Sequence, residues 1–508
     1  MKLPRVLFSI MRIHTIKILC FVGCNIFSYS LFAADTSLVN ILNSNSLNIL
    51  TIDGKEVKKL IGQVKIQHNE TIMDCDVAII DEFNNVDAQG NIVIHKGATV
   101  TIHGNSLYYQ SKEKFATLKG NVRLKDSKMT LQTNELFYDM NKDIGYYNNK
   151  GLVTSQDNKI RSNKGTYFAN AKDIFFKDEV TVVNPKFKLK SDTLKYNSET
   201  EIATFYGGTQ IYNDSSTIWC KTGWYNTKTN ISAFGANTII LSSPQWIRTD
   251  SLYYDKNIGY GKVLKNYDYH DTSLHITLEG NLADYYDKIN KVIGYNRPLL
   301  TYEQEDKNHL YLRADTLITL EENNVKSFFG YKNVRLFKND FQAVCDTLLY
   351  SMADSTFKLY NKPIVWNDST QLKADTIFLF TKNKKPFKAD LYQNAMAAEH
   401  IQSYAFNQMT GKYIYIYFKD GKTDFLNAIY EAKCKYYGKE EGKGYQGLNT
   451  AEADEIKGFF VKGKMNRIQF LGNPKAVFTP IKKLNSSHYY LLNFEWKDVL
   501  RPKSKNNL

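Results

Sequence analysis

The chain has 508 residues, 43% of them hydrophobic, which is enough to bury a sizeable core. Its formal net charge of +14 favours an anionic partner, such as a phosphorylated lipid or a polysaccharide. No run rich in Lys and Arg is interleaved with aromatic residues, so composition excludes a nucleic-acid interface and we expect no nucleic-acid partner. The 35 Tyr and 29 Phe favour β-structure, because aromatic side chains suit a half-buried pleated surface.

Residues 1–34 resemble a secretory signal peptide. Basic residues between positions 2 and 17 precede an apolar stretch at 18–31, and a cleavage site is predicted near Ala34. One alternative is acylation of Cys24, because Phe21-Val22-Gly23-Cys24 loosely matches a lipobox. The apolar stretch is short for a membrane anchor, which needs about 20 residues. We therefore expect export of the mature chain.

A repeat of 29 residues dominates positions 35–400. Stepping forward from Tyr109 by 29 residues returns a tyrosine five times, and one step back returns Ile80. With small insertions the pattern extends to twelve copies, anchored at Ile49, Ile80, Tyr109, Tyr138, Tyr167, Tyr196, Tyr225, Tyr254, Tyr285, Thr319, Tyr350 and Leu379. Such regularity predicts a repetitive β-solenoid.

Each anchor is preceded by four positions that have a characteristic residue type: those seven, five, four and two residues before it. The residue seven positions before the anchor is apolar, the one five before is small, and the one two before is most often Leu. An uninterrupted strand alternates its faces, so it could not point all of these and the anchor inward. The residue four before the anchor is Asp or Asn in every copy except one, where it is Lys221. Because Asp and Asn tolerate bulges and turns, a bend is predicted there.

A second strand follows in most copies, for example at 120–124 and 179–182. Two strands and two turns account for one repeat, so each repeat is predicted to form one rung. Twelve rungs spaced by about 4.8 Å would make a column roughly 55–60 Å long. Residues 401–482 are predicted to form a C-terminal β extension, and residues 483–508 a basic polar tail.

No catalytic or metal site is predicted. The nine His show no metal-ligand spacing, and the sequence has no H-E-x-x-H, G-x-S-x-G or phosphate-cradling glycine loop. The repeated Asp and Asn indicate structural corners rather than an acidic active site. Cys75, Cys220 and Cys345 are predicted to be free thiols, because the rung spacing puts Cys75 and Cys220 about 24 Å apart. We expect no enzyme activity and no cofactor.

The segment 107–138 carries a family resemblance. Its parts Leu107-Tyr108-Tyr109, Lys119-Gly120-Asn121-Val122-Arg123-Leu124 and Asn134-Glu135-Leu136-Phe137-Tyr138 resemble a repeat of the LptA/OstA (organic solvent tolerance, lipopolysaccharide transport) family. The chain is similar to OstA-like proteins that carry many such repeats. The resemblance implies an all-β, open, V-shaped β-jellyroll, whose apolar interior receives the acyl chains of lipopolysaccharide (the lipid A tails).

The resemblance also implies a function and a location. The expected function is that of a periplasmic scaffold, in a Gram-negative bacterium and associated with the outer membrane, that assists lipopolysaccharide transport and outer-membrane assembly. The expected partners are lipopolysaccharide and other transport components, stacked end to end as LptC-like or LptD-like β-jellyrolls. The candidate lipid-binding residues form an interior ladder of Leu107, Tyr109, Leu136, Tyr138, Tyr167, Leu194, Tyr196, Tyr225, Leu252 and Tyr254.

Three alternatives remain open from the sequence. Any ladder tyrosine can simply fill the core of a solenoid without touching lipid. The chain can be the periplasmic part associated with an outer-membrane barrel. It can also be a β-helix enzyme that acts on polysaccharide, for which Lys221 is the only hint because it alone interrupts the Asp/Asn ladder.

Overall fold

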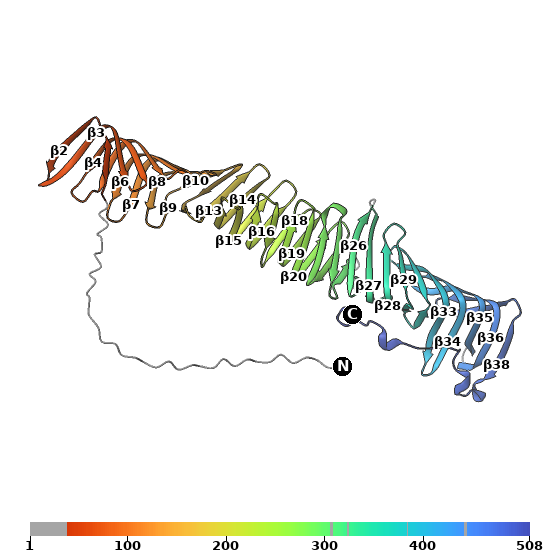
Figure 1. Cartoon of the computed structure of the whole chain (residues 1–508). Helices are drawn as coiled ribbons and strands as arrows, with labels where there is room; N and C mark the ends of the chain where they lie inside the picture. Colours follow the sequence, from red (N-terminus) through yellow and green to blue (C-terminus); the bar gives the residue numbers. More distant parts are fainter. Residues whose placement is uncertain (1–37, 305–307, 323–324, 384, 441–443) are drawn as a thin grey trace, which may run out of the picture.

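The computed structural model describes residues 38–304, 308–322, 325–383, 385–440 and 444–508. Figure 1 shows one elongated column of strands that follow the chain in order. Helix in the described part is limited to short 3-10 turns at Asp287–Ile289, Ile481–Lys483, Ser486–His488, Asp498–Leu500 and Lys505–Asn507. The predicted all-β jellyroll is confirmed. The predicted signal peptide, including Cys24 and Ala34, lies outside the described residues.

The column consists of 28 bent strands in the described chain, each with its bend near the middle. In ten of them the bend interrupts the strand and divides it into two, which gives 38 strands in all. The uninterrupted ones are β3 (Lys55–His68), β4 (Thr71–Ile80), β5 (Val86–Lys96), β6 (Val100–Gln110), β7 (Phe115–Lys125), β8 (Thr130–Asp139), β13 (Asp173–Asn184), β14 (Phe187–Asn197), β15 (Ile202–Tyr212), β16 (Thr217–Asn226), β19 (Gln245–Asp255), β20 (Tyr260–Asp271), β27 (Val325–Phe337), β28 (Gln342–Ser351), β33 (Lys385–Gln402), β34 (Ala405–Lys419), β35 (Lys422–Glu440) and β36 (Gly444–Val461). The interrupted ones are β1 (Asn40–Asn43) with β2 (Ser46–Ile52), β9 (Ile144–Tyr147) with β10 (Gly151–Ser155), β11 (Asn158–Ser162) with β12 (Lys164–Phe168), β17 (Ile231–Phe234) with β18 (Thr238–Ser242), β21 (Ile276–Gly280) with β22 (Leu282–Tyr286), β23 (Lys291–Tyr295) with β24 (Leu299–Tyr302), β25 (Leu310–Arg313) with β26 (Thr316–Glu322), β29 (Thr356–Tyr360) with β30 (Ile364–Asn367), β31 (Thr370–Lys373) with β32 (Thr376–Lys382), and β37 (Lys464–Leu471) with β38 (Lys475–Pro480).

The predicted rung is wrong in one respect: each 29-residue repeat supplies two antiparallel bent strands, not one layer. The strands β4, β5, β6 and β7 pair one after another, and the anchors Ile80 and Tyr109 lie on β4 and β6. The column is therefore about 130 Å long at the usual strand spacing, roughly twice the predicted length. Sequence periodicity could not show this. The repeat is 29 residues long whether its two strands share one layer of the column or form two successive layers.

The longer column leaves the prediction of free thiols intact. Cys75 on β4 and Cys220 on β16 are ten bent strands apart, or about 48 Å, far beyond the reach of a disulfide. The four cysteines of the described chain, which include Cys345 and Cys434, are all free thiols.

The bend lies where Asp or Asn was expected to produce it. On β7 the pairing register with β8 shifts between Lys119 and Val122, so two residues, Gly120 and Asn121, lie opposite the single residue Asn134. Gly120 has a φ of +77°, and a Cβ there would lie 2.7 Å from Asn105 Nδ2 on the preceding strand, so glycine is required. Corner side chains bond between neighbouring strands, as in Asn91–Asp76 (2.9 Å), Asn266–Asp250 (2.8 Å), Asn333–Asp315 (2.8 Å) and Asn394–Asp375 (2.8 Å).

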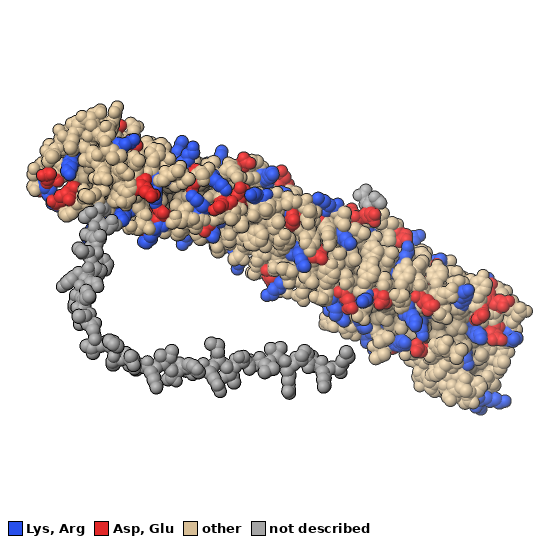
Figure 2. Space-filling view, viewed as in Figure 1, with Lys and Arg blue, Asp and Glu red and all other residues tan. Residues whose placement is uncertain are grey.

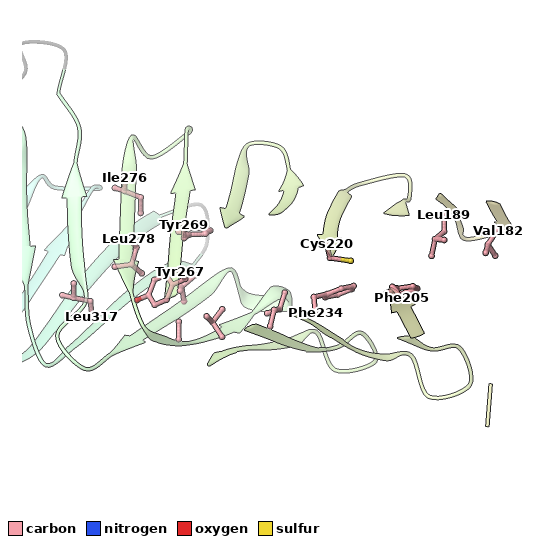
Figure 3. Packing of buried hydrophobic residues seen from close by; sticks show 14 of the residues in the cluster. Val182, Leu189, Phe205, Cys220, Phe234, Tyr267, Tyr269, Ile276, Leu278 and Leu317 are labelled. Atoms are coloured by element: carbon pink, nitrogen blue, oxygen red, sulfur yellow. The ribbon is translucent and has the colours of Figure 1, made fainter. Parts of the chain in front are cut away.

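The bends divide the column into two walls that enclose the core. The first wall contains the positions seven and five before each anchor, and the second wall contains the anchors and the positions two before them. On β6, Ile102 of the first wall and both Leu107 and Tyr109 of the second wall are buried, so the ladders converge as predicted. In Figure 3, Leu189 and Cys220 of the first wall face Phe205 of the second.

The ladder does not stop at residue 400, because β33 crosses that position and the long strands β34, β35 and β36 continue the pairing. Residues 484–508 then turn back along the outer face of the first wall, as Figure 1 shows. We call this segment the strap. It covers three buried glutamines that occupy one repeat position, eight residues before Tyr350, Leu379 and Ile416: Gln342, Gln371 and Gln408.

The strap is bound through its backbone. Gln371 Nε2 donates to Glu495 O (2.7 Å), and its Oε1 accepts from Lys497 N (2.8 Å). Gln408 bonds Tyr489 O and Leu491 N in the same way, at 2.8 Å each. Strap aromatic rings also pack on Phe406 of the outer face, including Phe494 and Trp496 with ring centroids 5.0 Å away. The predicted polar tail is thus a packed element.

Candidate functional site

An apolar cavity of about 670 Å³ lies between the two walls in the middle of the column. We call it the chamber. The first wall contributes Leu189, Ile211, Ile218, Ile240 and Ile247 to its lining, and the second wall contributes Leu194, Tyr196, Phe205, Phe234 and Leu252 among others. A volume of this size is within the range of about 300–1,000 Å³ that holds small-molecule ligands.

Over the chamber, the inward-facing side chains of both walls become more exposed. In the first wall, Ile160 and Leu189 are buried, Ile218 and Ile247 are half-buried, and Leu278 is fully buried again. In the second wall, Tyr225, Tyr254 and Tyr285 are half-buried, while Tyr167 and Tyr196 before them and Tyr350 after them are buried. Inward-facing apolar side chains that are left half-exposed indicate a surface that can take up an apolar ligand.

Small residues make room along the floor of the second wall. Across the paired strands, the tyrosines of the chamber alternate with Ala203, Ser232 and Gly261, each seven residues after an anchor. At the corresponding positions toward the C-terminus stand Val292 and then Phe357. The size of this one repeat position therefore distinguishes the chamber from the interior beyond its C-terminal end.

Aromatic rings fill the interior beyond the C-terminal end of the chamber. The ring of Tyr350 lies 4.6 Å from that of Phe328 and 4.3 Å from that of Phe357, measured between centroids. Phe341 of the first wall packs on Phe357 edge to face, at 5.9 Å. We call these four side chains the aromatic plug, since they join the two walls.

Polar contacts close the mouth of the V in the N-terminal part of the column, where the interior space is only about 60 Å³. Tyr109 Oη lies 2.8 Å from His68 Nδ1, and Lys96 forms an ion pair with Asp143. Each contact joins a turn or strand end of the first wall to one of the second. The interior is therefore closed in this part of the column, although Ala116 and Gly145 are small.

Asp126 forms the most buried of these contacts. It accepts hydrogen bonds from Tyr167 and from Lys172 Nζ, the latter at 3.1 Å, and both donors lie on the second wall side. Burial alone would raise the pKa of Asp126, but hydrogen bonds from Tyr167, Ser127 and Lys172 outweigh it and hold the pKa below its ordinary value. Asp126 is thus a carboxylate at neutral pH.

The Asp126→Asn variant is expected to lose about 2 kcal/mol of unfolding free energy at pH 7, because a buried charged hydrogen-bond acceptor is removed. A carboxyl whose folded pKa is depressed stabilises the fold above its unfolded pKa of about 3.9, and this stabilisation is lost as pH falls through the folded pKa. Thermal unfolding of the two proteins should therefore differ at pH 7 and converge below pH 3. An equal difference at both pH values would contradict the assignment.

The mouth of the chamber is lined by tyrosine hydroxyls and mixed charges. Tyr254 and Tyr285 both donate to Asp287, at 3.4 and 3.0 Å, and Tyr225 donates to Asn230 at 3.0 Å. Burial raises the pKa of Tyr254 to about 12, so its hydroxyl stays protonated. Lys186 and Lys256 stand on the two rims. Figure 2 shows that the visible face of the column mixes both signs of charge rather than forming a single-sign field.

The ten predicted ladder residues fall into two groups. Leu194, Tyr196, Tyr225, Leu252 and Tyr254 line the chamber. The other five lie in the closed N-terminal part: Leu107, Tyr109, Leu136, Tyr138 and Tyr167 are all buried there. The structure therefore separates the predicted strip into an open segment and a packed segment.

Sequence reasoning missed the opposite side of the chamber. Ile218 and Ile247 belong to the apolar position seven before the anchors, which was recognised but not assigned to the site. Phe205 and Phe234 lie on the intervening strands. The sequence position that could have located the chamber is the one seven residues after each anchor. Its residue is small in the chamber and large in the aromatic plug.

The described ranges contain no helix long and apolar enough to cross a membrane. Within the same ranges, no three His, Cys, Asp or Glu side chains come together in a group that could hold a metal ion. The corner carboxylates are spread along the column, each beside its own strand pair.

Comparison with known proteins assigns part of the chain to a family. Residues 36–192 match the OstA-like protein family. No curated protein matches the chain. Solved structures that match include LptH from Pseudomonas aeruginosa, described as the LptA homologous periplasmic component of the conserved lipopolysaccharide transport device. It is 14% identical, with a TM-score of 0.20, and the match covers 21% of this chain and 81% of LptH. The chain is therefore OstA-like over residues 36–192, which form the first part of a ladder that continues in the same architecture to residue 480.

Proposed function

We propose that this protein is a periplasmic scaffold that holds lipopolysaccharide by its acyl chains and assists its transport and the assembly of the outer membrane. The observation that carries the proposal is the chamber, where the apolar interior of an OstA-like column opens to about 670 Å³. An acyl chain placed there loses contact with water, which contributes about 25 cal/mol per Å² of buried apolar surface. Binding needs no covalent step, so we propose no enzyme activity and no cofactor.

The mouth of the chamber suits an amphipathic ligand. Lys186 and Lys256 on its rims are exposed and form no ion pair within the described structure, so they can attract the phosphates of a headgroup that stays outside. Such attraction between exposed charges is screened by salt. We therefore propose lipid-A tails between the walls and the phosphorylated sugar at the rim.

The two ends of the column support a proposal about partners. In the described chain, β1 and β2 pair only with β3, and β37 and β38 pair only with β36, so one edge of each is free. Ile49 at the first edge and Phe478 at the last are exposed. Unpaired strand edges with apolar side chains are templates for strand addition. We propose that other β-jellyrolls of the transport system, LptC-like or LptD-like, stack there end to end.

Photo-crosslinking tests lipid binding. A photo-reactive amino acid at Leu194, which lines the chamber, should capture lipopolysaccharide in Gram-negative envelopes. The same group at the neighbouring Lys195 should not, because that side chain lies on the outer face, 3.0 Å from Asp173. Capture at Lys195 alone would mean that the inward face is misassigned. Silence at Leu194, Lys195 and Tyr225 would leave the chamber as an unused cavity and end the proposal.

A further inference from the structure

The chamber is closed at both of its ends along the column, and this determines how a ligand can reach it. On the C-terminal side, the aromatic plug fills the interior. On the N-terminal side, the walls meet at buried residues such as Tyr147 and Tyr167, and Tyr167 donates across the interior to Asp126. Farther toward the N-terminus, the cavity lined by residues between Val39 and Met140 measures only about 60 Å³. A lipid held in the chamber therefore has no open path along the interior in either direction.

The mouth of the V, by contrast, is open over the chamber, between two contacts that join its rims. On its N-terminal side the rims touch where Gln156 Nε2 donates to Glu201 Oε1, at 2.9 Å. On its C-terminal side they touch where Lys326 Nζ donates to Ser273 Oγ, also at 2.9 Å. These exposed bonds are weak, but they mark where the two rims approach each other.

Between these two contacts, no hydrogen bond or ion pair of the described residues crosses the mouth. One aromatic contact does cross it: the rings of Phe187, beside the first rim, and Tyr225, of the second wall, meet edge to face with their centroids 5.8 Å apart, so a ligand entering there would have to displace it. The first rim consists there of the turns 185–186, 213–216 and 243–244, and the second rim of the turns 227–230 and 256–259. Lys186, Ser215 and Lys256 of these turns line the chamber, so the opening leads directly into it. We call this opening the window.

We propose that the chamber is a discrete holding site that is loaded and emptied sideways through the window, and that the interior of this chain is not a continuous conduit. The inference rests on the proposed lipid binding. It adds the path by which the lipid enters and leaves, and the number of lipids that the chamber holds. A volume of about 670 Å³ is in the range that holds one small-molecule ligand, so the chamber accepts part of the acyl region of a single lipid, not a file of lipids along the column. Movement between neighbouring proteins would then expose the lipid at the window at each transfer.

A bridge across the window tests the route. The double variant Ser215→Cys/Thr229→Cys leaves both rim lysines in place and puts one exposed thiol on each rim, and a bismaleimide reagent joins them. The chain's own thiols should react slowly, because burial raises the pKa of Cys220 to about 11 and that of Cys75 to about 12. The matched control is Ser215→Cys/Ser243→Cys, whose two thiols lie on the same rim, so that the same reagent leaves the window open.

Loading of fluorescently labelled lipopolysaccharide onto the full-length proteins is the readout. The cross-window bridge should slow loading by about tenfold or more, since binding then requires an alternative opening, whereas the same-rim bridge should leave the rate unchanged. Protein loaded first and bridged afterwards should retain its lipid. Equal loading rates for the two bridged proteins would overturn the lateral route while leaving lipid binding intact. No uptake by the unbridged protein would overturn the proposed function, and with it this inference.

A second measurement tests the closed ends. A photo-reactive group at Tyr225 should capture the labelled lipid, and the same group at Tyr109 or Phe357 should not, because those positions lie in the latched segment and in the plug. Capture at all three positions, with binding preserved, would show that the interior opens along its length and that the conduit exists after all.

Discussion

The Ala203→Trp variant is expected to retain about tenfold less lipopolysaccharide than the natural chain. Ala203 lies on the chamber floor between Tyr196 and Tyr225, on adjacent strands, and it lines the cavity. An indole group there occupies the space that acyl chains would use, and a loss of only about 1.4 kcal/mol of binding free energy lowers the affinity tenfold. The folded protein should lose little stability, because the ring enters empty space.

Ala116→Trp is the matched control. Ala116 holds the same repeat position between Tyr109 and Tyr138, but it is buried in the closed N-terminal segment. Overpacking a filled core costs at least about 1–3 kcal/mol, so this variant should unfold at a lower temperature and, where folded, still bind lipid. Ala203→Trp should therefore lower lipid retention and leave the unfolding temperature nearly unchanged, whereas Ala116→Trp should lower the unfolding temperature and leave lipid retention unchanged. If Ala203→Trp binds lipid normally, acyl chains do not use the chamber.

Removal of the strap, residues 484–508, is expected to have the largest effect on stability. It would uncover Phe406, on which strap rings pack, and the fully buried Trp366, which lies between the strap-bound Gln342 and Gln371 on paired strands. Burial of each large apolar side chain is worth about 1.5–3 kcal/mol. It would also leave Gln371 and Gln408 without the backbone partners that each bonds at both ends of its amide. We expect a loss of at least about 5 kcal/mol from these contributions together.

The loss should be local. A column in which each strand touches only its neighbours has stability that varies along its length. Hydrogen exchange should therefore lose protection in β30–β34 and keep it in β4–β8. Gln371→Ala alone should reproduce part of the effect, while Lys373→Ala, which removes only the exposed ion pair with Glu495, should not. Uniform loss of protection over both regions would show that the column unfolds as one cooperative unit.

The sequence was most informative where many copies repeat one requirement. Twelve aligned anchors identified the inward ladder, and the Asp/Asn position identified the bend, because each physical constraint recurs in every repeat. Ile49 is the exception, since it lies on the edge strand β2 and is exposed. A pattern within one strand cannot reveal whether a further strand covers it.

The extent of the chamber could not be read from the pattern for a different reason. The rims that meet across the mouth are about 45 residues apart, as for Gln156 and Glu201, so closure depends on pairs that belong to different repeats. Tyr138 and Tyr254 occupy equivalent positions in the sequence, yet one is packed and the other lines the opening. Likewise, the polar side chain of Gln371 predicts a surface position in its strand, and the residue is buried because the strap, which is distant in the sequence, covers it.

The hairpin nature of the repeat restricts how columns of this kind can differ in length. Insertion of a whole 29-residue hairpin lengthens the column by about 10 Å and leaves every other strand running in its original direction. Insertion of one strand alone would reverse all strands that follow, and would move their turns from one rim to the other. The residues that face each other across the mouth would then be exchanged for unrelated ones. Relatives of different size are therefore expected to differ by even numbers of strands, and the length of their columns would change in discrete steps.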